Sequence, residues 1–155
     1  MHPIFYKIIS RLGLQTYLRL TRSKTLGVRV AVFDDADAVM LVRQSYSPGW
    51  ILPGGGVEKG ELLQFSAKRE ILEEAGIVAE GPLVLHGIFS NEKKFSGDFV
   101  CLFVLRQFRQ VAWKPDAEIL EAKFFPTDQL PVDITDGSRA RIGEILKGDP
   151  ISEYW

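Results

Sequence analysis

The chain has 155 residues, of which 46% are hydrophobic and 25% are charged. This length fits one compact domain with a single hydrophobic core, and the net charge of −1 argues against a general nucleic-acid-binding protein, which usually carries a basic excess. The sequence contains no apolar run of the roughly 18 residues that span a bilayer, and its one cysteine, Cys101, cannot form an internal disulfide. We therefore expect a cytoplasmic protein.

Residues 1–24 are predicted to form a basic amphipathic helix outside the main domain. Ile4, Ile8 and Leu12 recur every four residues, and every charged side chain in residues 1–30 is basic. We expect this helix to pack on the domain or on the partner subunit of a homodimer. Contact with a membrane surface is the alternative, and the acid-free, arginine-bearing start also resembles a mitochondrial presequence.

The main domain is predicted to begin with a hairpin. Leu26–Phe33 is a β-branched run, residues 34–37 break it, and Val39–Arg43 follows as its pairing partner. Trp50–Leu52 is a short apolar segment that leads into three consecutive glycines, residues 54–56. Such a loop can adopt backbone conformations that other residues resist.

The rest of the chain predicts helices alternating with strands. Glu61–Ala75 has a core-facing edge of apolar residues spaced four apart, and Gly76 stands where a C-terminal helix cap belongs. The further elements are strands at Leu83–Phe89, Phe99–Gln110 and Lys123–Pro126 and a helix at Ser138–Lys147. This order predicts an α/β fold with helices covering a mixed sheet.

Three glutamates mark the predicted helix as a candidate metal site. Glu70, Glu73 and Glu74 have the i, i+3, i+4 spacing that places side chains on one side of a helix, where like charges repel. A solvated acidic face is the plain interpretation. The preceding glycine loop, and Arg69 at pairing distance from Glu73, favour a hard cation instead, because magnesium is held by a few carboxylates together with water and substrate phosphates.

The segment GGVEKGELLQFSAKREILEEAGI, residues 55–77, resembles the signature box of the Nudix hydrolases. That box is Gly, five residues, Glu, seven residues, Arg-Glu, an aliphatic residue, any residue, Glu-Glu, any residue, Gly and an aliphatic residue. Every position is met, by Gly55, Glu61, Arg69, Glu70, Ile71, Glu73, Glu74, Gly76 and Ile77. The resemblance implies an α/β/α sandwich with a mixed β-sheet over residues 25–155.

The resemblance also implies roles for individual residues. Glu73 and Glu74 would be the principal metal ligands, Glu70 a ligand or general base, and the carbonyl of Gly54 or Gly55 a further ligand. Arg69 would orient Glu73, and Glu61 would position the loop and the helix. A later acid would bind metal or act as a base; Glu118 is the candidate, with Asp116 in reserve and a surface carboxylate as the plain interpretation of Glu118.

The implied activity is Mg²⁺-dependent hydrolysis of a phosphoanhydride bond in a small nucleotide, with Mn²⁺ able to substitute. The substrates expected are nucleotide sugars, ADP-ribose or (d)NTPs; the alternatives are an RNA 5′-end pyrophosphohydrolase and a non-catalytic nucleotide-binding module. Tyr46 is a candidate for stacking on a base, and Arg43, Lys93 and Lys94 for phosphate contacts, although a lysine pair is more often a solvated turn. Trp50 and His86 are expected to be structural.

Overall fold

The computed structural model describes residues 24–155. The predicted helix of residues 1–24, with its predicted partner-subunit and membrane contacts, therefore lies outside the described residues except for Lys24. Within the described part of the chain, no helix combines the length and the apolar character needed to cross a membrane.

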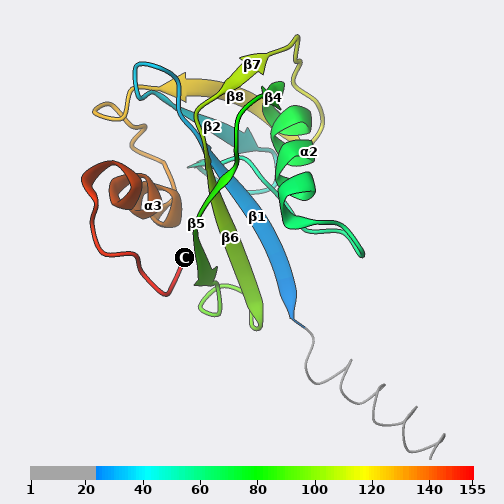
Figure 1. The fold of residues 1–155 in the computed structure, drawn as a ribbon, viewed down its shortest axis with the longest axis vertical. Helices are drawn as coiled ribbons and strands as arrows, with labels where there is room; N and C mark the ends of the chain where they lie inside the picture. Colours follow the sequence, from blue (N-terminus) through cyan, green and yellow to red (C-terminus); the bar gives the residue numbers. More distant parts are fainter. Residues whose placement is uncertain (1–23) are drawn as a thin grey trace, which may run out of the picture.

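The described residues form three layers, with a helix on each side of the β-structure (Figure 1). The elements in chain order are β1 (Thr25–Val32), β2 (Val39–Gln44), β3 (Trp50–Ile51), α2 (Leu63–Ala75), β4 (Ile77–Ala79), β5 (Val84–Ser90), β6 (Asp98–Leu105), β7 (Phe108–Gln110), β8 (Ile119–Phe125) and α3 (Asp136–Lys147). The predicted α/β/α sandwich is confirmed.

The strands form one mixed sheet and two antiparallel ones. In the sheet of order β1-β6-β5, β1 runs parallel to β6 and β5 runs antiparallel to it. The sheet of order β3-β2-β8 is antiparallel, as is the small pair of β4 and β7.

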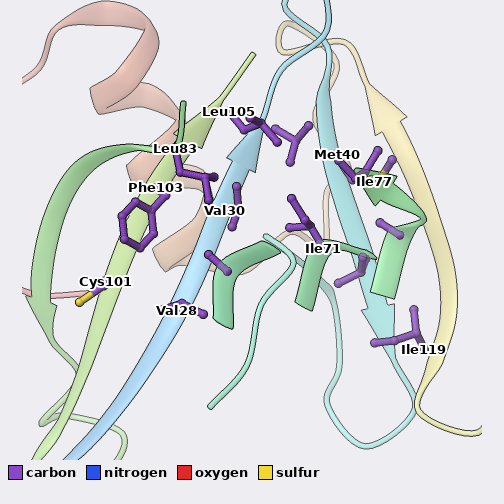
Figure 2. Packing of buried hydrophobic residues seen from close by; sticks show 14 residues of the cluster. Val28, Val30, Met40, Ile71, Ile77, Leu83, Cys101, Phe103, Leu105 and Ile119 are labelled. Carbon is purple, nitrogen blue, oxygen red and sulfur yellow. The ribbon is translucent and has the colours of Figure 1, made fainter. Parts of the chain in front are cut away.

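Alternate residues of β1 enter two different cores, as expected for a strand buried on both faces. Val28, Val30 and Val32 pack in the cluster that contains Ile71 of α2. Figure 2 shows Val28, Val30 and Ile71 in the space between β1 and the helix. Ala31 belongs instead to the cluster that contains Ile142 of α3. The two helices therefore cover opposite faces of β1.

The predicted hairpin between Leu26–Phe33 and Val39–Arg43 is wrong. The tight turn exists, since the Asp34 carboxylate accepts the Ala36 and Ala38 amides, but β1 and β2 belong to different sheets and only Phe33 and Val39 form a bridge. The free edge of β1 is taken by the glycine loop. The amides of Val28 and Val30 in β1 donate to the carbonyls of Gly55 and Pro53. The loop therefore occupies the edge of β1 at which a hairpin partner would pair.

Two other strand predictions needed correction, and one short strand was not predicted. The predicted strand Phe99–Gln110 is two strands, because the pairing of β6 with β1 ends at Leu105 and the chain pairs next with β4, a short strand that was not predicted. β8 starts at Ile119 rather than Lys123, because pairing with β2 begins there. The predicted helix ends hold within two residues, and Gly76 caps α2 with a left-handed φ of 63°.

Candidate active site

The glycine loop lies directly against β1. The Val28 amide donates to the Gly55 carbonyl at 2.9 Å. Gly54 has a φ of 142°, and a Cβ at this position would lie 2.1 Å from the Val28 carbonyl oxygen. Only glycine allows the loop to approach β1 this closely.

Glu74 joins this loop to α2. Its Oε2 accepts the Gly54 amide at 2.7 Å, and the residue is only 6% exposed. Burial raises the pKa of Glu74 to about 7, although the Gly54 amide and the charge of Arg29 act in the opposite direction. A cation beside this carboxyl would favour its charged form.

Glu70 and Glu73 stand on the same helix in different surroundings. The Glu70 carboxylate lies against the loop, since a Cβ on Gly55 would be 2.7 Å from its Oε2. Burial raises the pKa of Glu70, opposed by the neighbouring Arg69. The Glu73 side chain is 61% exposed, so its carboxylate is open to solvent and to ligands.

Arg69 ties these acids together. Its guanidinium makes two bonds to Glu61, at 2.8 and 3.0 Å, one to Glu70 at 2.7 Å and a longer one to Glu73 at 3.3 Å. The bonds from Arg69 lower the pKa of Glu61 to about 2. Glu61 also accepts the Glu58 amide at 3.0 Å, so the pair connects the loop before α2 to the helix itself.

The glycine loop, Arg69 and the three glutamates of α2 line one cleft of about 790 Å³. Glu118 is also in its lining, and the Tyr46 hydroxyl donates to Glu118 Oε1 at 3.2 Å. Lys93 and Lys94, from the loop between β5 and β6, add positive charge to the lining. Acidic and basic side chains thus share one cavity, which suits a phosphate ligand held together with a cation.

The carboxylates fit a hard divalent cation by their chemistry. Among residues 24–155, no three His, Cys, Asp or Glu side chains converge as a ready-made metal site. Glu70 and Glu74 instead face protein donors, Arg69 and the Gly54 amide. They nevertheless form, with Glu73, an oxygen-only donor set on one wall of one cleft, and this is the kind of ligand that Mg²⁺ and Mn²⁺ prefer.

Comparison with known proteins decides the family. The model of the NUDIX domain matches residues 23–144. The chain belongs to the NUDIX family. This match confirms the resemblance found in the signature box and extends it well beyond those residues.

The names of the curated NUDIX relatives describe different enzyme activities. An ADP-ribose pyrophosphatase from Methanocaldococcus jannaschii is 27% identical over 128 residues, 81% of this chain and 75% of that protein. A rat diphosphoinositol polyphosphate phosphohydrolase 2 is 34% identical over 87 residues, 56% of this chain and 48% of that protein. The chain spans a third to a half of the length of several of the curated relatives it matches.

Solved structures agree on the fold. A MutT NUDIX hydrolase from Burkholderia pseudomallei has a TM-score of 0.69 at 22% identity, over 79% of this chain and 98% of that one. A mutator MutT protein from Bacillus halodurans has a TM-score of 0.66 at 26% identity, over 82% of this chain and 85% of that one.

The NUDIX cleft brings together most of the residues singled out in the sequence. Its lining includes Gly54, Gly55, Arg69, Glu70, Glu73, Glu74, Glu118, Tyr46, Lys93 and Lys94. Their chemical roles stay predictions.

Two of the named candidates lie elsewhere. The Arg43 guanidinium pairs with Glu121 at 3.5 Å and Asp133 at 3.1 Å. It lines an adjoining groove that shares residues 44, 46 and 47 with the cleft. Asp116 accepts the amides of Glu118 and Ile119, so it shapes the turn that carries Glu118.

Arg29 is a cleft residue that was not among the candidates predicted from the sequence. Its guanidinium donates to the carbonyls of Leu52 at 2.9 Å and Gly54 at 2.7 Å, and burial lowers its pKa. Arginine within an otherwise apolar strand was the available signal, because a charge inside a buried strand needs partners. The Gly54 carbonyl therefore already accepts one bond, which leaves its second lone pair for a cation.

Proposed function

We propose that the NUDIX domain, residues 25–155, hydrolyses a phosphoanhydride bond in a nucleoside diphosphate linked to another group, such as a nucleotide sugar, ADP-ribose or a (d)NTP. The proposed cofactor is Mg²⁺, with Mn²⁺ able to substitute. The observation that carries this proposal is the shared cleft, in which Glu70, Glu73 and Glu74 occur together with Lys93 and Lys94.

The cation would be held by Glu73 and Glu74, with Glu70 and the Gly54 or Gly55 carbonyl as further ligands. When bound, it would neutralise diphosphate charge and act as a Lewis acid. Arg69 and Glu61 would act through position, since their pairing fixes Glu70 relative to the glycine loop. Burial of Glu74 favours the same assignment, because a buried carboxylate is stabilised by a neighbouring positive charge.

Glu70 and Glu118 are the two candidates to accept the proton of an attacking water. Glu70 combines a raised pKa with a position in the cleft lining, and a base with a pKa nearer neutrality is more effective at neutral pH. Glu118 lies in the same lining and is held by Tyr46. Loss of this proton lets the water oxygen form its bond to phosphorus as the bridging oxygen leaves with the second phosphate fragment.

Lys93 and Lys94 would bind the phosphates, and their charge would offset the repulsion between a diphosphate and the glutamates. Tyr46 presents a largely exposed ring beside Glu118 for contact with the nucleoside. Arg43 is the weakest of the sequence candidates, because two carboxylates already pair with it.

A screen of nucleotide sugars, ADP-ribose and (d)NTPs with Mg²⁺ or Mn²⁺, read by release of phosphate-bearing products, tests the proposal. Glu74→Gln removes the charge and keeps the shape, and should lower turnover by about 100-fold or more, as when a group that stabilises transition-state charge is removed.

Glu80→Gln is the matched control, because Glu80 pairs with Arg109 on an exposed surface. It should leave turnover unchanged. Near-native turnover of Glu74→Gln would overturn the assignment of the glutamates. Tight nucleotide binding without turnover by the wild-type protein would instead indicate a non-catalytic binding module.

A further inference from the structure

Residues 152–155 run along the end of β5 and reach the cleft. The Ser90 amide donates to the Glu153 carbonyl at 2.8 Å, and the Trp155 amide donates to the Ser90 carbonyl at 3.0 Å, so the segment adds a short parallel bridge to the sheet. Figure 1 shows the end of the chain beside the end of β5 and near α3.

Buried charges of α3 hold this segment in place. Glu144 Oε1 accepts the Ser152 amide at 3.0 Å, and Arg141 donates to the Tyr154 carbonyl. Arg141 and Glu144 also pair with each other at 2.6 Å, and His86 contacts the second Glu144 oxygen at 3.1 Å. Because these charged groups are buried and mutually paired, they fix the path of the backbone that leads to Trp155.

The Trp155 indole is fitted against the start of α3. A Cβ on Gly137 would lie 2.6 Å from the indole Nε1, so this glycine leaves the space that the ring needs. The ring meets Phe89 edge-on, with centroids 5.8 Å apart and an interplanar angle of 73°. Trp155 is only partly buried and lines the same cleft as the glutamates.

We propose that Trp155 is a substrate-binding residue that favours ligands with a base: its indole binds the planar base of the nucleotide while the diphosphate lies at the glutamates. This inference rests on the proposed function, since it assigns a subsite within the same cleft. An aromatic face suits a base because every base has a stacking surface. Phe89 and Gly137 fix the ring beforehand, which reduces the entropy lost on binding.

A purely structural role would also explain part of this packing, because Trp155 contacts the core cluster that contains Phe89 and Ile142. The two roles differ in what they change. Loss of a base-binding ring weakens the binding of nucleotides and leaves the binding of ligands without a base unchanged. Loss of a core side chain lowers the stability of the protein and weakens the binding of every ligand to the same extent.

The test uses full-length Trp155→Ala and Trp155→Phe. Calorimetry measures binding of AMP, GMP, CMP and UMP, and steady-state kinetics compares a nucleotide substrate with 5-phosphoribosyl 1-diphosphate, a diphosphate that lacks a base. In Trp155→Ala, the Kd and KM for the preferred nucleotide should rise by about tenfold or more, the scale of one base-stacking contact. Its kcat and its kinetics on the base-free diphosphate should change little, and Trp155→Phe should retain most of the affinity.

Glu153→Gln is the control, because it changes an exposed side chain of the same segment and leaves the Trp155 ring in place. It should keep wild-type nucleotide affinity. Unchanged nucleotide affinity in Trp155→Ala, equal losses on the base-free diphosphate, or no nucleotide binding by the wild-type protein would overturn the inference. If the wild type binds nucleotides through Trp155 but cleaves none, the proposed hydrolysis fails while this subsite stands.

Discussion

At the scale of single residues, the cleft is built around charges that the fold has removed from water. Glu74 is the clearest case, because it is 6% exposed and bonded to a backbone amide rather than to a cationic side chain. Arg29 supplies a compensating charge, and one nitrogen of its guanidinium donates to two carbonyls. Both side chains thus bond Gly54, the Glu74 carboxyl through the amide and the Arg29 guanidinium through the carbonyl.

The raised pKa of Glu74 predicts how stability depends on pH in protein freed of cations with a chelator. The folded state holds the proton more tightly than the unfolded state, so the free energy of unfolding should fall as pH rises from 4.5 to about 7. The fall attributable to Glu74 is about 3 kcal/mol at most. Urea unfolding at a series of pH values measures it.

Glu74→Gln has no proton to lose and should show a shallower pH dependence, with higher stability than the wild type at alkaline pH. Glu80→Gln should follow the wild type, because Glu80 lies on the exposed surface. Parallel curves for the wild type and Glu74→Gln would mean that Glu74 is not destabilised when charged.

At the scale of elements, the sequence predicted best where spacing within one segment decides the structure. α2 and its cap at Gly76 follow from local periodicity, and the glutamates followed from α2. The pairing of strands was harder to predict, because it depends on segments distant in sequence. The sequence of β1 predicts one strand of a hairpin. In the structure, β1 instead pairs with β6 along one edge and bonds the glycine loop along the other.

The same reasoning explains which parts of the candidate site were found. The box residues of α2 share a face through helix geometry alone, so no tertiary contact had to be known. Arg29 and Trp155 enter the cleft only because β1 and the 152–155 segment pass beside it. Arg43 has the positive charge expected of a phosphate-binding residue, but its guanidinium pairs with Glu121 and Asp133 instead of lining the cleft.

The packing of the glycine loop on β1 predicts that an alanine is harmful at position 54 and tolerated at position 56. Gly54→Ala should destabilise the protein and reduce turnover, because its φ is positive and its Cβ would overlap the Val28 carbonyl. Gly56→Ala should be tolerated, since a Cβ there meets nothing within 4 Å. Thermal unfolding and turnover of both variants measure the difference, and equal behaviour would show that the loop is not held against β1.

At the scale of the whole molecule, the cleft is made by every layer of the sandwich. α2 contributes the carboxylates, β1 contributes Arg29, and the β5–β6 loop contributes the lysines. α3 contributes through its first turn and through the 152–155 segment that it holds. The Leu52 amide donates to Ser138 Oγ at 3.1 Å, so the start of α3 is also joined to the residues just before the glycine loop.

The hold of α3 on the 152–155 segment should weaken in acid. Burial alone would raise the pKa of Glu144, but bonds from Ser152 and His86 and the charge of Arg141 outweigh it and lower that pKa. The charged form of Glu144 therefore contributes stability above its usual value of 4.5, and this contribution is lost as pH falls through the lower pKa of the folded protein. Hydrogen exchange at the Ser152 and Trp155 amides, followed as pH is lowered, measures the release.

Two variants separate this release from general acid unfolding. Glu144→Gln should expose the two amides already at neutral pH, because a neutral side chain cannot balance the buried Arg141. Glu153→Gln should behave as the wild type, since its exposed side chain lies outside the paired cluster. If the two amides in Glu144→Gln stay as protected as the amides of β6, Glu144 has no part in holding the segment, and its bonds to Ser90 and Arg141 keep Trp155 in the cleft.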